Sequence, residues 1–235
     1  EKALFVLSQI ETQEARDLLV EVERSGSPGL REDAVRMIGI NGEPAAMAAL
    51  ADLYRAGDAD MREAVLEAYL IADDADAVLA IAEAATTADE FESAVQTLGA
   101  MNATEQLRAL RGKKGMSETL IEAYAVAGDT EFLRELALDG SDPEQQAEAL
   151  HGLAVAGGTE ANEVFLQVYR GAQDEKLKEA ALEAMLIADY DEGVLTLFQE
   201  SQDPKEKRRL LETLVNMDSD AVWDIIDATL ENGGA

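Results

Sequence analysis

Hydrophobic and polar positions along the chain follow one nine-residue pattern that recurs about every thirty residues. The pattern is apolar at its first, second and fifth positions and polar at its third, as in the copy at 94–102. Apolar residues at this spacing share one face of a helix, and the polar third position then faces solvent. The ninth position is Gly, Asn or Asp in seven copies, and these residue types tolerate the left-handed backbone that ends a helix. Each copy therefore predicts one helix with a defined end.

Eight copies of this pattern cover the chain, and a second helix follows each of them. The copies begin at Ala3, Ala34, Val65, Ala94, Leu120, Ala149, Ala181 and Leu210. The second helices show apolar residues three and four apart, as at Val78, Ile81 and Ala82. Period-two alternation is not sustained anywhere, so no strand is expected.

One helical hairpin is too small to bury its own apolar face, so the hairpins are expected to stack. The predicted fold is all-α, an α-solenoid of about eight stacked helical hairpins. We expect a single repeat domain over 1–235, with units starting near 1, 30, 60, 89, 115, 143, 174 and 204.

Local signals agree with these boundaries. Pro143 and Pro204 follow Asp142 and Asp203, which is the order of an N-cap residue and a first-turn proline. The least regular place is the segment 111–115, which we interpret as a loop after a shortened second helix.

The two ends differ. Phe5 occupies a position that is polar in the other copies, and the chain starts at Glu1 without an initiator Met. We therefore expect a fragment of a longer parent chain that continues upstream, or an end that meets a partner. The basic residues between Lys205 and Arg209 make the last unit polar, as a terminal cap should be.

Composition narrows the function. The 235 residues include 19 Lys and Arg against 49 Asp and Glu, a formal net charge of −30. Such a polyanion is not expected to bind nucleic acid or an anionic membrane surface. The absence of Cys and the single His151 exclude thiolate zinc sites, thiol nucleophiles and multi-histidine metal sites. No apolar run is long enough for membrane insertion in this segment. We predict no catalytic, cofactor-binding or metal-binding residues.

Acidic residues recur at the predicted turns between helices: Asp73, Asp74, Asp129, Asp189, Asp191, Asp218 and Asp220. They could form a calcium ladder or an anionic docking strip, or they could cap helix ends. Capping is the favoured interpretation, because no loop has the ligand spacing of an EF-hand.

The eight copies and their turn position resemble the HEAT-repeat family, including the PBS-lyase HEAT-like repeats of bacterial proteins. The resemblance implies an α-solenoid that usually serves as a protein-binding scaffold and, in a minority of members, carries out lyase chemistry. It also implies that second helices line the concave face. Arg108 and Arg134, at matching positions of two second helices, are therefore the leading partner-contact candidates, although an i,i+3 or inter-layer salt bridge is the favoured explanation of both.

Three further residues are contact candidates. Lys113 and Lys114 form a basic spot, either a contact or a solvated loop. The lone Trp223 either packs in the last layer, which is the favoured interpretation, or is an exposed anchor.

The sequence favours a non-enzymatic scaffold that binds a protein or peptide with a basic surface on its concave face. The alternatives are a HEAT-like lyase-type enzyme or a subunit of one, and a structural spacer in a larger envelope protein. The expected location is the bacterial periplasm or cell envelope, with the cytoplasm as the alternative.

Overall fold

The computed structural model describes residue 21 and residues 28–42, 44–114, 118–139, 141–156 and 158–232. The described residues are helical or in turns, and they contain no strand. They form two compact units, residues 1–127 and 128–235, which we call unit 1 and unit 2. The confirmed fold class is all-α with stacked helical hairpins; the first hairpin, expected before residue 28, lies outside the described residues. The single repeat domain over 1–235 stays a prediction.

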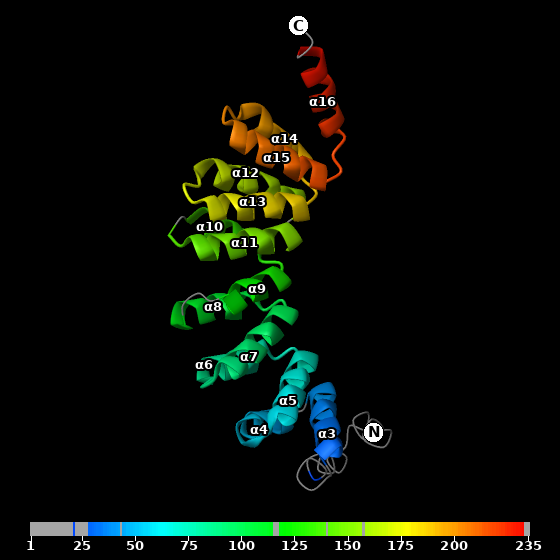
Figure 1. The fold of residues 1–235 in the computed structure, drawn as a ribbon. Helices are drawn as coiled ribbons and strands as arrows, with labels where there is room; N and C mark the ends of the chain where they lie inside the picture. Colours follow the sequence, from blue (N-terminus) through cyan, green and yellow to red (C-terminus); the bar gives the residue numbers. More distant parts are fainter. Residues whose placement is uncertain are drawn as a thin grey trace. The chain divides into compact units, whose positions relative to one another are not determined.

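Unit 1 contains seven helices with described bounds (Figure 1). They are α3 (Pro28–Asn41), α4 (Pro44–Ala56), α5 (Ala59–Ala72), α6 (Ala75–Ala84), α7 (Ala88–Ala100), α8 (Thr104–Lys114) and α9 (Glu118–Val126). The first helices of successive hairpins pack on one another, α3 on α5, α5 on α7 and α7 on α9. The second helices α6 and α8 also meet.

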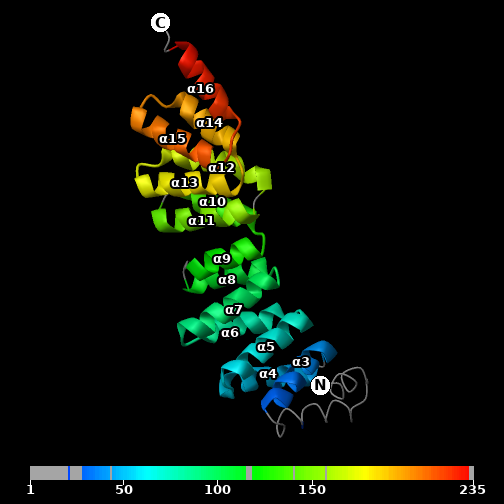
Figure 2. The same cartoon turned by 45° about the vertical axis from the view of Figure 1, so that its right-hand side comes forward.

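Unit 2 repeats the arrangement with α10 (Thr130–Asp139), α11 (Pro143–Ala156), η1 (Gly158–Ala161), α12 (Asn162–Gly171), α13 (Glu175–Ile187), α14 (Asp191–Glu200), α15 (Pro204–Asn216) and α16 (Ala221–Asn232). Helices α11 and α13 lie side by side in both ribbon views (Figure 2). In both units, the described first helices begin within three residues of the repeat starts expected from the sequence.

The fifth position of the pattern forms the core of both units. From the second copy onward its residues are Ile38, Tyr69, Leu98, Tyr124, Leu153, Met185 and Leu214, and all are buried. Burial raises the pKa of Tyr69 to about 12, because its charged form would lose water. The third position faces solvent, and His151 is exposed as expected.

The ninth position ends the first helices as the sequence predicts. Its described residues all have positive φ: Gly42, Asp73, Asn102, Gly128, Asp189 and Asp218. Glu11 and Gly157, at the same position of two other copies, lie outside the described residues. Capping by the turn carboxylates is confirmed at Asp74 and Asp129, whose side chains accept from the backbone N–H of Ala77 and Phe132. The described residues contain no group of three or more Asp, Glu or His that could hold a metal ion.

The sixth position sets how closely neighbouring first helices approach. A Cβ on Gly39 would lie 2.5 Å from the backbone oxygen of Ala68, so α3 and α5 meet only because position 39 has no side chain. Gly99 lies against Ala123 of α9 in the same way, with its Cβ position 3.1 Å from the backbone oxygen. The same position is Leu70 in α5, and α5 packs less closely on α7 than α3 packs on α5.

One local expectation is wrong. The segment 111–115 was interpreted as a loop, but α8 continues through Lys114. Arg and Lys favour helix, and basic residues near a helix C-terminus interact favourably with its dipole, so Gly112 does not stop the helix.

Candidate functional site

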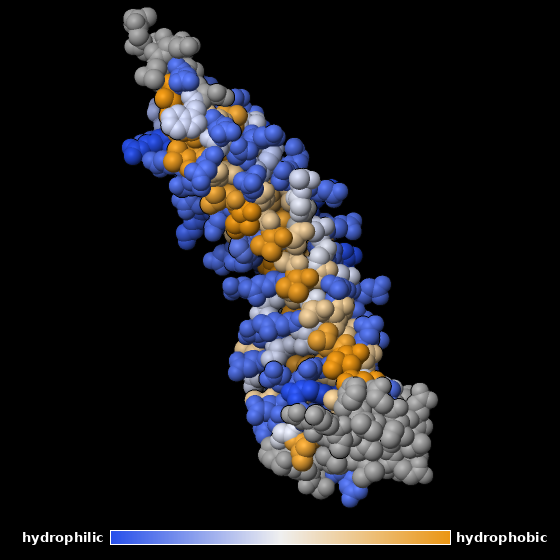
Figure 3. Space-filling view, turned by 90° about the vertical axis from the view of Figure 1, so that its right-hand side faces the viewer, coloured by the Kyte–Doolittle hydropathy of each residue, from blue (hydrophilic) through white to orange (hydrophobic). Residues whose placement is uncertain are grey.

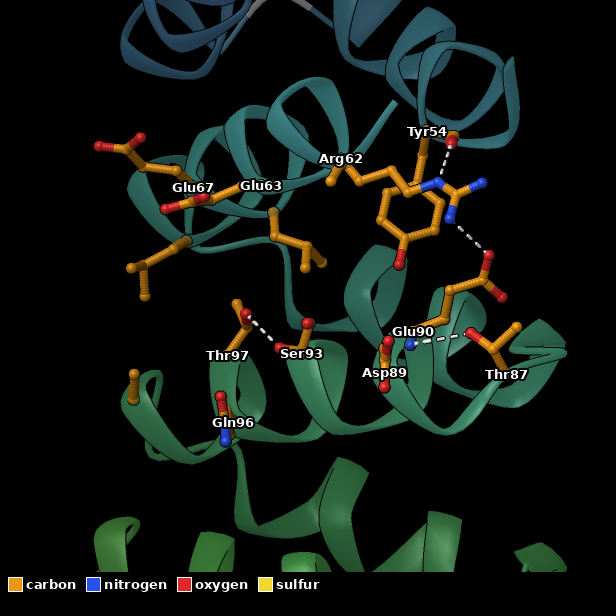
Figure 4. A pocket seen from close by; sticks show the side chains of 14 residues that line it. Tyr54, Arg62, Glu63, Glu67, Thr87, Asp89, Glu90, Ser93, Gln96 and Thr97 are labelled. Atoms are coloured by element: carbon orange, nitrogen blue, oxygen red, sulfur yellow. Dashed lines mark hydrogen bonds and ion pairs between the residues drawn. The ribbon is translucent and has the colours of Figure 1, made fainter. Parts of the chain in front are cut away.

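A cleft opens in unit 1 where α5 and α7 diverge. It has a volume of about 760 Å³ and is bordered by both helices and by Tyr54 of α4. Leu66 and Leu70 of α5 and Ala100 of α7 supply its apolar surface. In Figure 4, Glu63 and Glu67 lie toward one end, Tyr54, Arg62 and Glu90 lie toward the other, and Ser93 lies between them. We call this feature the α5–α7 cleft.

The Tyr54 end of the cleft is held by one basic side chain. Arg62 lies over the Tyr54 ring, with its guanidinium carbon 5.8 Å from the ring centre, and donates to the Tyr54 backbone carbonyl at 3.3 Å. It also pairs with Glu90 at 2.8 Å. The N–H and hydroxyl of Thr86 donate to Glu90 and, with Arg62, lower the pKa of that carboxyl below its usual range. Burial, followed by the charge of Glu90, raises the pKa of Tyr54.

The acidic end of the cleft is only partly neutralised. Glu67 pairs with Arg36 of α3. Glu63 at this end and Asp89, which lies beside Glu90 at the Tyr54 end in Figure 4, are both exposed, and among the described residues neither has an ion-pair partner. The cleft thus has an apolar floor and two carboxylates available to a cation from outside.

Unit 2 carries a matching cluster at the same positions of the repeat. Aligning α5 with α13 and α7 with α15 pairs Arg62 with Lys178 and Glu90 with Glu206. Tyr169, at the end of α12, takes the place of Tyr54 and donates to Glu206 at 3.0 Å. Lys178 lies 5.6 Å from the centre of the Tyr169 ring and 3.7 Å from Glu206.

An additional ion pair occupies the unit 2 cluster. Arg209 donates to the Tyr169 hydroxyl at 3.2 Å and to Glu175 at 2.7 Å. The corresponding residues of unit 1 are Ser93 and Ala59, and both line the α5–α7 cleft. The cleft of unit 1 is therefore open at the two positions that an arginine and a glutamate fill in unit 2.

A second feature is a row of exposed apolar side chains at the C-terminal ends of the first helices. We call it the apolar row: Ile40, Leu70, Ile71 and Val126 in unit 1, and Val155, Leu186, Ile187 and Val215 in unit 2. Val126 and Val155 are 66% and 68% exposed. Figure 3 shows hydrophobic side chains bordered by hydrophilic ones on the face that it displays. Six of the seven described first helices contribute to the row, all except α7, so the row recurs with the repeat.

Sequence reasoning missed the row although its signal was present. The seventh position of the pattern is apolar in six of the eight copies: Ile40, Ile71, Ala100, Val126, Val155 and Ile187. An apolar seventh position reads as part of the buried face, since it lies three residues after the fourth, which is buried at Ala68, Ala123 and Ala184. The described helices place it at the edge of each layer instead.

The predicted contact residues lie away from the α5–α7 cleft. Arg108 is exposed on α8, and Lys113 and Lys114 are the last two residues of the same helix, with side chains outside the described residues. Arg134 of α10 borders a smaller cleft of about 240 Å³ in unit 2, together with Glu131, Glu135 and Glu160. The roles of these residues as partner contacts stay predictions.

Trp223 of α16 is 68% exposed, so the favoured interpretation that it packs in the last layer is wrong. Helix α16 is the second helix of the last described hairpin, and no further layer of described residues covers the Trp223 side chain, so the indole reaches solvent. Its role as an anchor stays a prediction.

Comparison with family models agrees with the repeat architecture. Residues 1–70 match the family model for HEAT repeats, which confirms the HEAT-repeat resemblance seen in the sequence. Among solved structures, the phycocyanin lyase complex of CpcE and CpcF from Nostoc sp. PCC7120 aligns with a TM-score of 0.36 and 19% identity. That alignment covers 92% of this chain and 88% of the other. No curated protein matches the chain. None of the described helices is long and apolar enough to cross a membrane.

Proposed function

We propose that the chain is a non-enzymatic scaffold that binds a segment of another protein along the apolar row. The observation that carries this proposal is the recurrence of the row in both units at the same positions of the repeat. Burial of the first, second and fifth positions already supplies the core, so folding does not require apolar residues at the sixth and seventh positions. Exposed apolar side chains that recur in each unit and are bordered by polar residues are typical of an interaction site.

Charge supports a basic partner. The chain carries a formal net charge of −30, and exposed carboxylates such as Glu122 and Glu183 lie on the same helices as the row. A negative surface accelerates encounter with a positive one and disfavours acidic partners. The predicted concave-face location and the spacer role in an envelope stay predictions; the row instead lies on the first helices.

The pKa directions in the cleft fit a binding surface better than a catalytic one. A glutamate that acts as a general acid near neutral pH needs a raised pKa. Glu90, which borders the α5–α7 cleft, has a lowered pKa because Thr86 and Arg62 stabilise its charged form. It is therefore held as a carboxylate, which suits it to positioning Arg62.

The test compares capture of proteins from an extract of the source cells by three immobilised forms of the chain. The row variant is Val126→Gln with Val155→Gln, and the matched control is Glu122→Gln with His151→Gln. The control changes exposed residues one turn earlier on the same two helices, α9 and α11.

At least one protein should be captured by the wild type and by the control, and about tenfold less by the row variant. Loss of two exposed valines from a contact of this kind corresponds to roughly 1.4 kcal/mol, which is tenfold in affinity. Identical capture by all three forms would contradict the apolar row as the binding surface.

A further inference from the structure

We infer that the α5–α7 cleft of unit 1 binds an arginine or lysine side chain of the partner segment, with an apolar neighbour on Leu66 and Leu70. This inference rests on the proposed scaffold function and adds the chemical class of the partner. Leu70 belongs both to the apolar row and to the cleft lining, so a segment lying along the row reaches the cleft.

The chain itself provides a basic side chain of this kind in unit 2. The guanidinium carbon of Arg209 lies 6.0 Å from the centre of the Tyr169 ring; the side chain donates a hydrogen bond to the tyrosine hydroxyl and pairs with Glu175. Its counterpart in unit 1 is Ser93, which leaves the equivalent space beside Tyr54 open. A guanidinium supplied by a partner would occupy in unit 1 the place that Arg209 occupies in unit 2.

The lining of the cleft suits a long basic side chain. Lysine and arginine carry apolar stems that pack on hydrophobic surface while the charged head stays at a polar edge. Leu66 and Leu70 offer that surface, and Glu63 lies about one turn before Leu66 and about two turns before Leu70 on the same helix. Arginine can also bond a carboxylate through two parallel N–H groups.

The charges of the cleft favour a cation over an anion. Among the described residues that line it, Arg62 is the only basic one, and it is already paired with Glu90. Glu67 is paired with Arg36, whereas Glu63 and Asp89 have no ion-pair partner among the described residues. An incoming cation therefore meets two available carboxylates, and an incoming carboxylate would meet repulsion.

Closing the cleft without changing the net charge separates this inference from general attraction to an acidic protein. The closing variant is Ala59→Glu with Ser93→Arg, which copies the Glu175 and Arg209 pair of unit 2. The matched control is Ala80→Glu with Ala109→Arg, which adds the same two residues at exposed positions of α6 and α8 in the same unit. Circular dichroism would establish that both variants keep their helical content.

The probe is a fluorescein-labelled peptide of three Arg-Leu-Ser-Gly repeats, titrated by fluorescence anisotropy at about 0.15 M salt. Two comparison peptides replace every Arg by Glu or every Leu by Ser. We expect the wild type and the control to bind the probe equally, and the closing variant to bind at least tenfold more weakly. Both comparison peptides should bind more weakly than the probe to the wild type.

Equal binding of the probe by the closing variant and the wild type would overturn the inference, as would absence of probe binding to the wild type. Such a result leaves the scaffold proposal intact if the row variant still loses its captured protein. Conversely, probe binding that depends on Ala59 and Ser93, together with capture that does not depend on the row, would sustain the cleft and overturn the row.

Discussion

The two polar clusters around Tyr54 and Tyr169 differ by one ion pair. In unit 2, Arg209 and Glu175 complete a closed network with Tyr169, Lys178 and Glu206. In unit 1, Ser93 and Ala59 stand at those positions and the network ends at Glu90. Both clusters share a tyrosine at the end of a second helix, a basic residue over its ring and a glutamate from the next first helix.

The comparison shows how two residues at matching positions decide whether this part of the repeat is filled by the chain's own side chains or left open. The hydrogen bonds that hold the layers in unit 2 come from side chains of the chain itself. At the equivalent positions of unit 1, two small residues leave the space beside Tyr54 unfilled and open to a side chain from outside. The two clusters differ at positions outside the buried core, and the buried fifth positions of the copies are the same kind of apolar residue in both units.

The largest expected effect tests how closely α3 and α5 pack in unit 1. Gly39→Ala places a Cβ against the backbone of Ala68, so α3 and α5 must separate. We expect a loss of about 2 kcal/mol in the free energy of unfolding, measured by urea denaturation. The control Gly29→Ala lies in the same helix with open space around its Cβ position, and should be neutral or slightly stabilising. Equal effects of the two substitutions would refute the role of the sixth position.

The next effect compares the two clusters directly. Arg209→Ser removes the ion pair with Glu175 and the hydrogen bond to Tyr169, and should cost about 1–2 kcal/mol of stability. The reverse substitution Ser93→Arg enters an open cleft and should change stability by less than about 0.5 kcal/mol. Thermal unfolding followed by circular dichroism measures both. A large loss on Ser93→Arg would show that the space beside Tyr54 is needed for packing.

The pH dependence of the unit 2 cluster gives a smaller effect. Hydrogen bonds from Ser201 and Tyr169, followed by the charges of Lys178 and Arg209, lower the pKa of Glu206 in the folded state despite its partial burial. A lowered folded pKa stabilises the protein above the ordinary glutamate pKa, and this contribution is lost as the pH falls through the folded value.

Glu206→Gln should therefore cost about 1 kcal/mol at pH 7, and the difference from the wild type should vanish toward about pH 3. Urea unfolding at the two pH values measures it. A difference that persists undiminished at the lower pH would mean that the charge of Glu206 is not what stabilises the cluster.

The smallest expected effect concerns α16. Because Trp223 is 68% exposed, Trp223→Ala should change the free energy of unfolding by about 0.5 kcal/mol or less. A loss of several kcal/mol, as is usual for a buried tryptophan, would restore the packing role expected from the sequence.

Much of the fold could be predicted from the sequence because its signals are local. Spacing of three and four identifies a helix face, and Asp73 or Asn102 marks its end through a backbone conformation that few residue types tolerate. The N-cap of Asp203 before Pro204 belongs to the same class, and its side chain accepts from the backbone N–H of Lys205. Each of these signals involves residues within one turn of the helix.

The candidate site could not be predicted because it depends on residues far apart in the sequence. Glu90 meets Arg62, and Arg209 meets Glu175, only once successive layers have stacked. Whether Leu70 is buried or lines a cleft depends on how closely α5 approaches α7, which no pattern within one helix specifies. The exposure of Trp223 likewise depends on whether another layer follows α16.

The position of a bound basic segment tests the central claim most directly. A photo-crosslinking form of the Arg-Leu-Ser-Gly peptide, bound to the wild type and mapped by mass spectrometry, reports which residues it touches. Crosslinks should fall on α5 between Arg62 and Leu70 and on α7 between Asp89 and Ala100, and should be lost when Ala59→Glu and Ser93→Arg are introduced together. Crosslinks that fall on the second helices or on unit 2, and persist in that variant, would contradict the assignment of the α5–α7 cleft as the site for a basic side chain.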